Sequence, residues 1–281
     1  MSFNTIEIII GIMVVFAFGI FSYYTKVVDK SGLFAGLYVG LTIWIFGGWA
    51  WFIIILIFHL FAAAATKYCY NEKNKLGFAQ EKGGARQWGN VLANGLTASI
   101  FALLYFLNSS FMGNHGTIYL VGYVGAISAM MADTIATELG LLSKKSPILI
   151  TTFKKVEPGT SGGITLLGEL AALLGSCIIG FTSWIFLELK FILFEKSYTF
   201  IIVICAIIGG LFGCFVDSIL GATIQGLYKC EKCNKITEKR VHSCGTISKK
   251  IRGINIINNN IVNLISSIFG SAISILIYIL I

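Results

Sequence analysis

The sequence is poor in charged residues, which make up 12% of its 281 positions against 56% hydrophobic residues. Its mean hydropathy is correspondingly high, at +0.84. A soluble globule of this length needs more polar surface than such a composition provides. We therefore predict that this chain is an integral membrane protein and that its main solvent is a lipid bilayer, such as the cell membrane.

The chain also lacks the alternation of apolar and polar residues that marks a transmembrane β-strand, so a β-barrel is not expected. Its hydrophobic runs are continuous, and each is long enough to cross about 30 Å of hydrocarbon at about 1.5 Å per helical residue. The sequence predicts an all-α, polytopic transmembrane helix bundle over residues 1–281. The predicted spans are residues 5–24, 33–47, 49–66, 88–107, 117–141, 163–187, 199–227 and 256–281. One span fewer stays open, because only Gly47 and Gly48 interrupt the stretch 33–66.

Lys and Arg are scarce in two of the predicted loops, 108–116 and 188–198, and more frequent in the others. Loops rich in these residues tend to stay in the cytoplasm, so the basic loops are predicted to be cytoplasmic and both termini external. This bias, with attraction to anionic headgroups, explains the net charge of +8 without a nucleic-acid partner. The first apolar segment lacks a basic region and a small-residue cleavage site, which favours a span over a signal peptide.

The fifth predicted span carries acidic residues, which are costly inside a bilayer and are therefore candidates for function. At about 100° per residue, one arc of about 140° contains Asp133, Thr134, Thr137 and Glu138. Two carboxylates beside hydroxyl groups suit a hard cation such as Mg²⁺, which takes oxygen ligands and usually bridges to phosphate. The alternative is a helix end whose acidic groups simply reach water.

A glycine-rich loop runs directly into the sixth predicted span. It begins with Lys154 and Lys155 and continues with the glycines and hydroxyl residues Gly159, Thr160, Ser161, Gly162, Gly163 and Thr165. Backbone N–H groups and the dipole of the following helix favour phosphate at such a position. The loop is not a Walker A motif, in which the Lys follows the glycines at a fixed spacing. The pattern predicts a phosphate cradle, with a flexible linker that caps the next helix as the alternative.

Further polar residues are predicted near the same membrane surface. Asp217 and Ser218 stand in the inner third of the seventh span, and Asp217 is a second candidate ligand for Mg²⁺. Amide and cationic side chains occur at the starts of the fourth and last spans, as Arg86, Gln87, Asn90, Asn94, Asn260 and Asn263. Amides at such positions either bind a phosphate, a ribose or a base, or join helices to one another.

Three of the seven cysteines stand close together in the stretch 228–254. Cys230 and Cys233 form a Cys-x-x-Cys pair, and His242 and Cys244 follow. These four side chains are enough for tetrahedral Zn²⁺ with no open coordination position. Because the loop is predicted to be cytoplasmic, where disulfides are disfavoured, we predict a structural zinc knuckle between the last two spans. Unmetallated thiols are the alternative.

These motifs together resemble a known pattern. They are Ala-Asp-Thr-x-Ala-Thr-Glu-x-Gly at 132–140, Val-x-Pro-Gly-Thr-x-Gly-Gly-x-Thr at 156–165, the segment 86–95 and the Cys-x-x-Cys at 230–233. They resemble the integral-membrane family that contains plant phytyl-phosphate kinase and transmembrane protein 19. More distantly, an intramembrane acid followed by a Lys- and Gly-rich loop is similar to dolichol kinase, phytol kinase and phosphatidate cytidylyltransferase.

The resemblance implies a phosphotransferase that moves a phosphoryl group from CTP or ATP to a phytyl, geranylgeranyl or polyprenyl monophosphate. In this interpretation Asp133, with Asp217 or Glu138, holds Mg²⁺, and the loop that begins at Lys154 cradles the triphosphate. Asn90 and Asn94 position the nucleotide or the lipid phosphate. The alternatives are a transporter or flippase of a phosphorylated lipid, a CTP-dependent cytidylyltransferase and a structural assembly factor. No clear inverted repeat supports the transporter.

Overall fold

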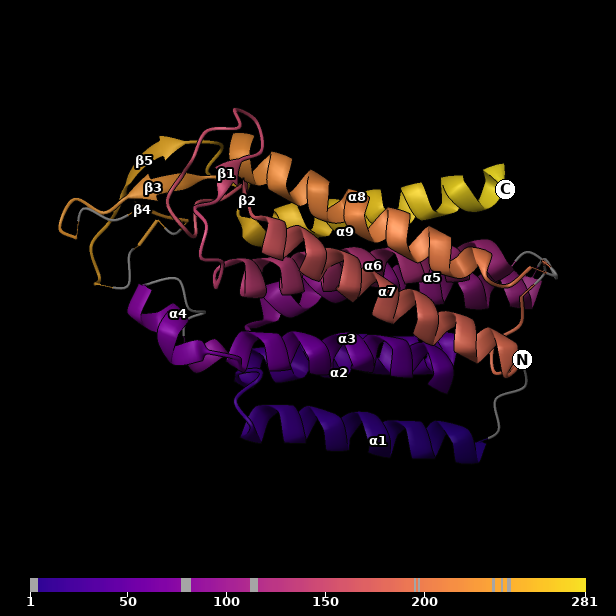
Figure 1. Ribbon diagram of the computed structural model, residues 1–281. Coiled ribbons are helices and arrows are strands. Elements are labelled where there is room, and N and C mark those ends of the chain that lie inside the picture. Colours follow the sequence, from indigo (N-terminus) through magenta and orange to yellow (C-terminus); the bar gives the residue numbers. More distant parts are fainter. Residues whose placement is uncertain are drawn as a thin grey trace.

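The structure, a computed structural model, describes residues 5–76, 82–111, 116–194, 196, 198–233, 236–238, 240–241 and 244–281. In these residues, eight helices are long and apolar enough to cross a membrane, and they form one bundle (Figure 1). They are α1 (Thr5–Tyr24), α2 (Lys30–Gly47), α3 (Trp49–Lys67), α5 (Trp88–Phe111), α6 (Gly116–Gly140), α7 (Leu166–Glu188), α8 (Ile201–Thr223) and α9 (Asn259–Leu280). The predicted all-α bundle and its spans are confirmed.

The shorter elements gather at one end of the bundle, which we call the sheet end (Figure 1). A short helix, α4 (Tyr70–Leu76), and a 3-10 turn, η1 (Lys82–Gly84), follow α3 in the chain. Strands pair antiparallel as β1 (Ile148–Leu149) with β2 (Gly163–Ile164), and β3 (Leu227–Lys229) lies between β4 (Ile236–Thr237) and β5 (Lys249–Arg252). The glycine-rich loop and the cysteine-containing segment therefore meet at the same end of the molecule.

Helix α6 lies at the centre of the bundle, packed against α3, α5, α7, α8 and α9. Its residues 120–132 are all buried. Helices in a bilayer associate through close packing and interhelical hydrogen bonds, which small residues permit. Ser128 Oγ donates to the Ala206 carbonyl at 2.6 Å, and a Cβ on Gly270 of α9 would stand 2.6 Å from the Ala129 Cβ. The small residues of α6 thus allow neighbouring helices to enclose it.

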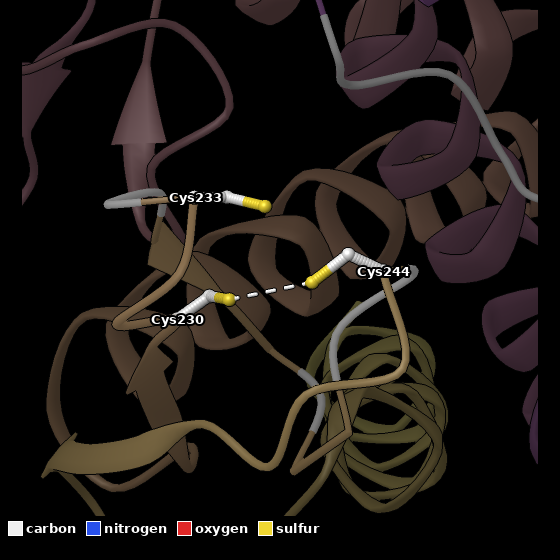
Figure 2. Close-up of side chains that lie close together, drawn as sticks. All are labelled: Cys230, Cys233 and Cys244. Carbon is white, nitrogen blue, oxygen red and sulfur yellow. Dashed lines mark hydrogen bonds between the residues drawn. The ribbon is translucent and has the colours of Figure 1, made fainter.

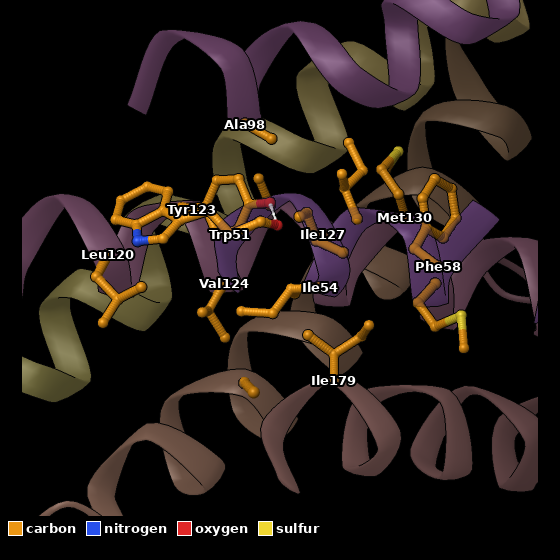
Figure 3. Packing of buried hydrophobic residues seen from close by; sticks show 14 of the residues in the cluster. Trp51, Ile54, Phe58, Ala98, Leu120, Tyr123, Val124, Ile127, Met130 and Ile179 are labelled. Carbon is orange, nitrogen blue, oxygen red and sulfur yellow. Dashed lines mark hydrogen bonds between the residues drawn. The ribbon is translucent and has the colours of Figure 1, made fainter. Parts of the chain in front are cut away.

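Large apolar side chains fill the space between α3, α6 and α7 (Figure 3). The rings of Trp51 and Tyr123 lie 4.5 Å apart between centroids, and the Tyr123 hydroxyl donates to the Trp51 carbonyl. That hydrogen bond satisfies the phenol where no water reaches it. Ile54, Ile127 and Ile179 pack beside these rings and are fully buried. This packing fixes α6 along its length and so positions the acidic residues near its sheet end.

Candidate active site

A cavity opens at the sheet end, where α6, α7 and α8 meet the glycine-rich loop. Its acidic lining consists of Asp133 of α6, Asp217 of α8, Glu169 of α7 and Glu238. Its other polar lining residues are Thr137, Ser143, Lys145, Thr160, Ser161, Thr165, Ser218 and Asn259, with the backbone of Gly159, Gly162 and Gly163. The structure therefore brings Asp133 and Thr137 of the fifth predicted span, the loop and the acidic residue of the seventh to one site.

Hydrogen bonds and a close approach to α8 fix the shape of the glycine-rich loop. Ile150 N donates to the Gly162 carbonyl at 3.0 Å, and Gly163 N donates to the Thr160 carbonyl at 2.9 Å. The φ of Gly162 is 80°, and a Cβ there would stand 2.6 Å from the Ser218 carbonyl oxygen. Glycine is required at this position for both reasons, since other residues rarely adopt positive φ. The loop therefore lies directly against α8 at Ser218, the residue that follows Asp217 in the chain.

The same loop ends as the N-terminal cap of α7. Thr165 Oγ1 accepts a hydrogen bond from Gly168 N at 3.0 Å, which occupies one of the free N–H groups of the first turn. Glu169 follows in that first turn and lines the cavity. The predicted capping role of the loop is thus present together with its place in the cavity wall. The two interpretations of this segment are compatible.

Asp217 belongs to a polar link that runs from α8 through α9 to α5. Ser266 Oγ donates to Asp217 Oδ2 at 3.2 Å, and Asn263 Nδ2 donates to Asn94 Oδ1 at 3.0 Å. When the Asn263 amide is turned over, its nitrogen donates instead to Asp217 Oδ2 at 3.3 Å and to the Asn259 carbonyl at 2.8 Å. We call Asn94, Asn263 and Asp217 the polar link. It joins helices, as one interpretation of the amides predicted, and it also reaches the cavity.

The donor set of the cavity fits Mg²⁺. Asp133 and Asp217 line it together and lie close enough for their charges to interact. Two carboxylates that repel each other at a helix end are stabilised by a cation between them, and the hydroxyl and amide oxygens nearby suit a hard metal. Asp133 and Asp217 would hold such an ion, and this assignment stays a prediction.

Glu138 lies outside the lining of this cavity. Its carboxylate is 2.6 Å from Lys73 Nζ of α4, and the two side chains are 7% and 0% exposed. The same ammonium donates to the carbonyls of Ala65 and Thr66 at 2.9 and 3.0 Å, so all three of its protons have acceptors. Glu138 therefore fastens α4 to α6, and a direct role in chemistry stays a prediction for this residue.

Several other predicted site residues also lie outside the lining. Lys154 and Lys155 are exposed on the loop, and Thr134 is buried in α6. The roles predicted for these three stay predictions. The predicted residues at the starts of α5 and α9 also lie outside the lining of this cavity. They are Arg86, Gln87, Asn90, Asn94, Asn260 and Asn263. Of these, Asn90 has a buried side-chain oxygen with no hydrogen-bond partner in the described part of the chain, and Asn260 lies next to Gly89.

Sequence reasoning missed five polar residues of the lining, namely Ser143, Lys145, Glu169, Glu238 and Asn259. Glu169 had a usable signal, because it lies one turn after the Thr165 cap on the same helix face. The other four, Ser143, Lys145, Glu238 and Asn259, had no such signal. Each reaches the cavity from an irregular segment or a helix end whose path the sequence does not reveal. Among the described residues of the lining, Lys145 is the one with a cationic side chain.

The three cysteines of the predicted knuckle lie together (Figure 2). The sulfur atoms of Cys230, Cys233 and Cys244 are all within 4.8 Å of one another, and Cys230 Sγ is 3.6 Å from Cys244 Sγ. A hydrogen bond with Cys244 raises the pKa of the Cys233 thiol to about 11. His242, the fourth predicted ligand, lies outside the described residues. The cluster could bind a metal ion, and soft thiolate ligands favour Zn²⁺.

These features define a polytopic membrane protein with a polar cavity at one end of its helix bundle. The chain belongs to the integral membrane protein family DUF92, whose model matches residues 13–271. It is similar to Protein PGR of Arabidopsis thaliana, with 34% identity over 265 residues that cover 89% of this chain and 88% of that protein. The family resemblance drawn from the motifs is confirmed.

Two further relatives extend the comparison. Uncharacterized membrane protein MJ0933 of Methanocaldococcus jannaschii is 30% identical over 274 residues, covering 97% of this chain and 95% of that protein. Protein VTE6, chloroplastic, of Arabidopsis thaliana is 25% identical over 250 residues, covering 88% of this chain and 64% of that protein. No solved structure matches the chain.

Proposed function

We propose that this protein is a membrane kinase that transfers a phosphoryl group from CTP or ATP to an isoprenoid monophosphate and yields the diphosphate. The observation that carries the proposal is the cavity in which Asp133 and Asp217 lie beside the Gly159–Gly163 loop. Carboxylates for a metal and backbone N–H groups for phosphate oxygens are the parts that phosphoryl transfer needs. The chain's motifs resemble those of the family that contains phytyl-phosphate kinase, and this resemblance supports the reaction.

In the proposed reaction, an oxygen of the lipid monophosphate attacks the γ-phosphorus. The new O–P bond forms while the bond from the γ-phosphorus to the bridging oxygen breaks, and the nucleoside diphosphate leaves. Mg²⁺, when bound by Asp133 and Asp217, would neutralise charge on the transferring phosphoryl group. The backbone of Gly159, Gly162 and Gly163 orients the triphosphate, and Lys145 adds positive charge at the cavity wall. The monophosphate already carries its nucleophilic oxygen, so positioning supplies most of the rate.

We also propose that the sheet end faces the cytoplasm. The loops rich in Lys and Arg that we expect to stay inside connect helices at this end. Nucleoside triphosphates are available in the cytoplasm, which agrees with a nucleotide-binding cavity on that side. Labelling of single cysteines introduced near residues 84 and 190, from either side of sealed vesicles, would test the orientation.

The test uses purified protein in detergent with Mg²⁺, nucleotides labelled at the α or the γ position, and a panel of prenyl monophosphates. Label from the γ position in a prenyl diphosphate, lost in Asp133→Asn and kept in Glu7→Gln, supports the kinase. Glu7 is a matched acidic control, because it is exposed in the first turn of α1 far from the cavity. Label from the α position alone would identify a cytidylyltransferase, and no transfer from either position would favour a transporter. Both outcomes would overturn the proposal.

A further inference from the structure

A second cavity, which we call the apolar cavity, lies among α1, α2, α3 and α5. Its walls are largely apolar and include Val15, Val39 and Phe52. Its polar lining consists of Ser22, His59, Arg86 and Asn94. Because α1 ends and α5 begins at the sheet end, Ser22 and Arg86 mark the polar end of this cavity (Figure 1). Val15 lies about 10 Å further into the bundle, at about 1.5 Å per residue.

The backbone around Arg86 is fixed by hydrogen bonds, while its guanidinium has no partner among the residues that the structure describes. Arg86 N donates to the Val27 carbonyl at 2.9 Å, and Asp29 N donates to the Arg86 carbonyl at 3.0 Å. Within the described part of the chain, no ion pair or hydrogen bond reaches the guanidinium. Burial lowers the pKa of Arg86, while the carboxylates of Glu138 and Asp133 act in the opposite direction. A partly buried cation of this kind attracts an anion, and Arg suits phosphate by its forked geometry.

The apolar cavity and the candidate active site are joined by polar groups. Asn94 lines the apolar cavity and bonds to Asn263, which lies next to Asp217 of the candidate active site. Arg86 also lines the apolar cavity and lies within electrostatic range of Asp133, which lines the other. A phosphate bound at Arg86 would thus lie within electrostatic range of Asp133. The polar link would connect the apolar cavity to Asp217.

We propose that the apolar cavity holds the hydrocarbon chain of an isoprenoid monophosphate from the bilayer, with the phosphate on Arg86 and directed toward the polar link. The inference rests on the proposed function for the identity of the lipid. The apolar walls take the chain out of the bilayer without exposing it to water, and the guanidinium complements the phosphate dianion. Charge and lining therefore favour one kind of occupant, a lipid with one hydrocarbon chain that ends in a phosphate monoester, as an isoprenoid monophosphate does.

Gly36 offers a way to fill this cavity without disturbing its walls. It lines the apolar cavity, and a Cβ built there would meet no atom within 4 Å. Gly36→Leu therefore places a side chain in the space proposed for the lipid, and replacing Gly inside a helix favours the helix. The matched control is Ala17→Leu, which adds a leucine to the exposed face of α1.

The experiment photolabels purified protein, without nucleotide, with a farnesyl monophosphate that carries a diazirine at its chain end. We expect labelled peptides from α1, α2, α3 or α5, about tenfold weaker labelling in Gly36→Leu, and unchanged labelling in Ala17→Leu. Arg86→Gln should weaken binding about tenfold, with partial recovery in Arg86→Lys. Unlabelled geranylgeranyl monophosphate should compete, whereas a diacyl phosphatidate and inorganic phosphate should not.

Labelling in other helices, wild-type labelling of Gly36→Leu, or equal competition by the phosphatidate would each overturn the inference. The result is separable from the proposed function, because labelling needs no phosphoryl transfer. Labelling as expected without transfer from any nucleotide would leave the lipid site in place and remove the kinase. Transfer with labels mapped elsewhere would keep the kinase and remove this lipid site.

Discussion

Two acidic residues of α6, about one and a half turns apart, have opposite surroundings. Asp133 lines a cavity with Asp217, and no ion pair is described for it, whereas Glu138 is enclosed and paired with Lys73. The sequence places both on one helix face, so helical periodicity alone does not separate them. The difference comes from α4, which lies outside the spans and brings an ammonium group to one acid only. An acidic residue inside a membrane helix can therefore stabilise a fold as well as bind a ligand.

The largest effect is expected where the Lys73–Glu138 pair is broken. Lys73→Met leaves the Glu138 carboxylate buried without its partner, and such a loss costs about 3–5 kcal/mol of the free energy of unfolding. Thermal unfolding of the protein in detergent measures this loss. The double variant Lys73→Met/Glu138→Gln should recover part of it, because no buried charge remains. Equal stability of wild type and Lys73→Met would show that the pair is not structural.

Asp133→Asn should sharpen the contrast in the other direction. We expect prenyl-phosphate kinase turnover to fall about 10²- to 10³-fold, the loss typical when one group that stabilises transition-state charge is removed. Unfolding in detergent should change little, since no ion pair among the described residues depends on this carboxylate. If Asp133→Asn instead unfolded at a lower temperature than wild type and its folded molecules kept wild-type turnover, Asp133 would have a structural role and not a catalytic one.

A smaller effect is expected from the loop. Gly162→Ala should reduce turnover about tenfold, because the new Cβ would press on the Ser218 carbonyl and displace the loop beside Asp217. Gly83→Ala is the matched control, since Gly83 has a φ of 69° but a Cβ there meets nothing within 4 Å. Both variants carry the cost of about 1–2 kcal/mol for a side chain at positive φ. Equal turnover in the two variants would show that contact with α8 does not matter.

The smallest effect on turnover is expected from the cysteine cluster, because Cys230, Cys233 and Cys244 are not part of the lining of the candidate active site. Purified protein should contain about one zinc per chain by mass spectrometry, and Cys233→Ser should lower this to about zero. Cys177→Ser, in α7, is the control and should keep the metal. The turnover of Cys233→Ser should stay within about threefold of wild type, because a structural metal has no open position for substrate. Zinc retained in Cys233→Ser would disprove the assignment.

Sequence reasoning predicted the bundle well because long apolar runs leave the backbone few alternatives to a spanning helix. The separation of α2 from α3 at Gly47 and Gly48 was predicted because the apolar stretch 33–66 is too long for one span, and a hairpin explains its length better. Sequence reasoning also predicted that Asp133, Asp217 and the glycine-rich loop lie near one another, since each is near the end of a span, and they line one cavity. The partner of Glu138 was not predictable, because Lys73 reaches it through a turn outside the spans. Arg86 and Asn94 were chosen as polar residues, but only the packing of four helices shows the apolar cavity beside them.

The central position of α6 has a consequence for how the protein is made. The chain is synthesised from its N-terminus, so α6 enters the bilayer before α7, α8 and α9, three of the helices that enclose it. During that interval its small residues and Asp133 face lipid or the insertion machinery, where an unpaired acid is costly. The cavity cannot exist until α8 brings Asp217 alongside. The candidate active site is therefore completed only late in biogenesis, when the last spans have been inserted.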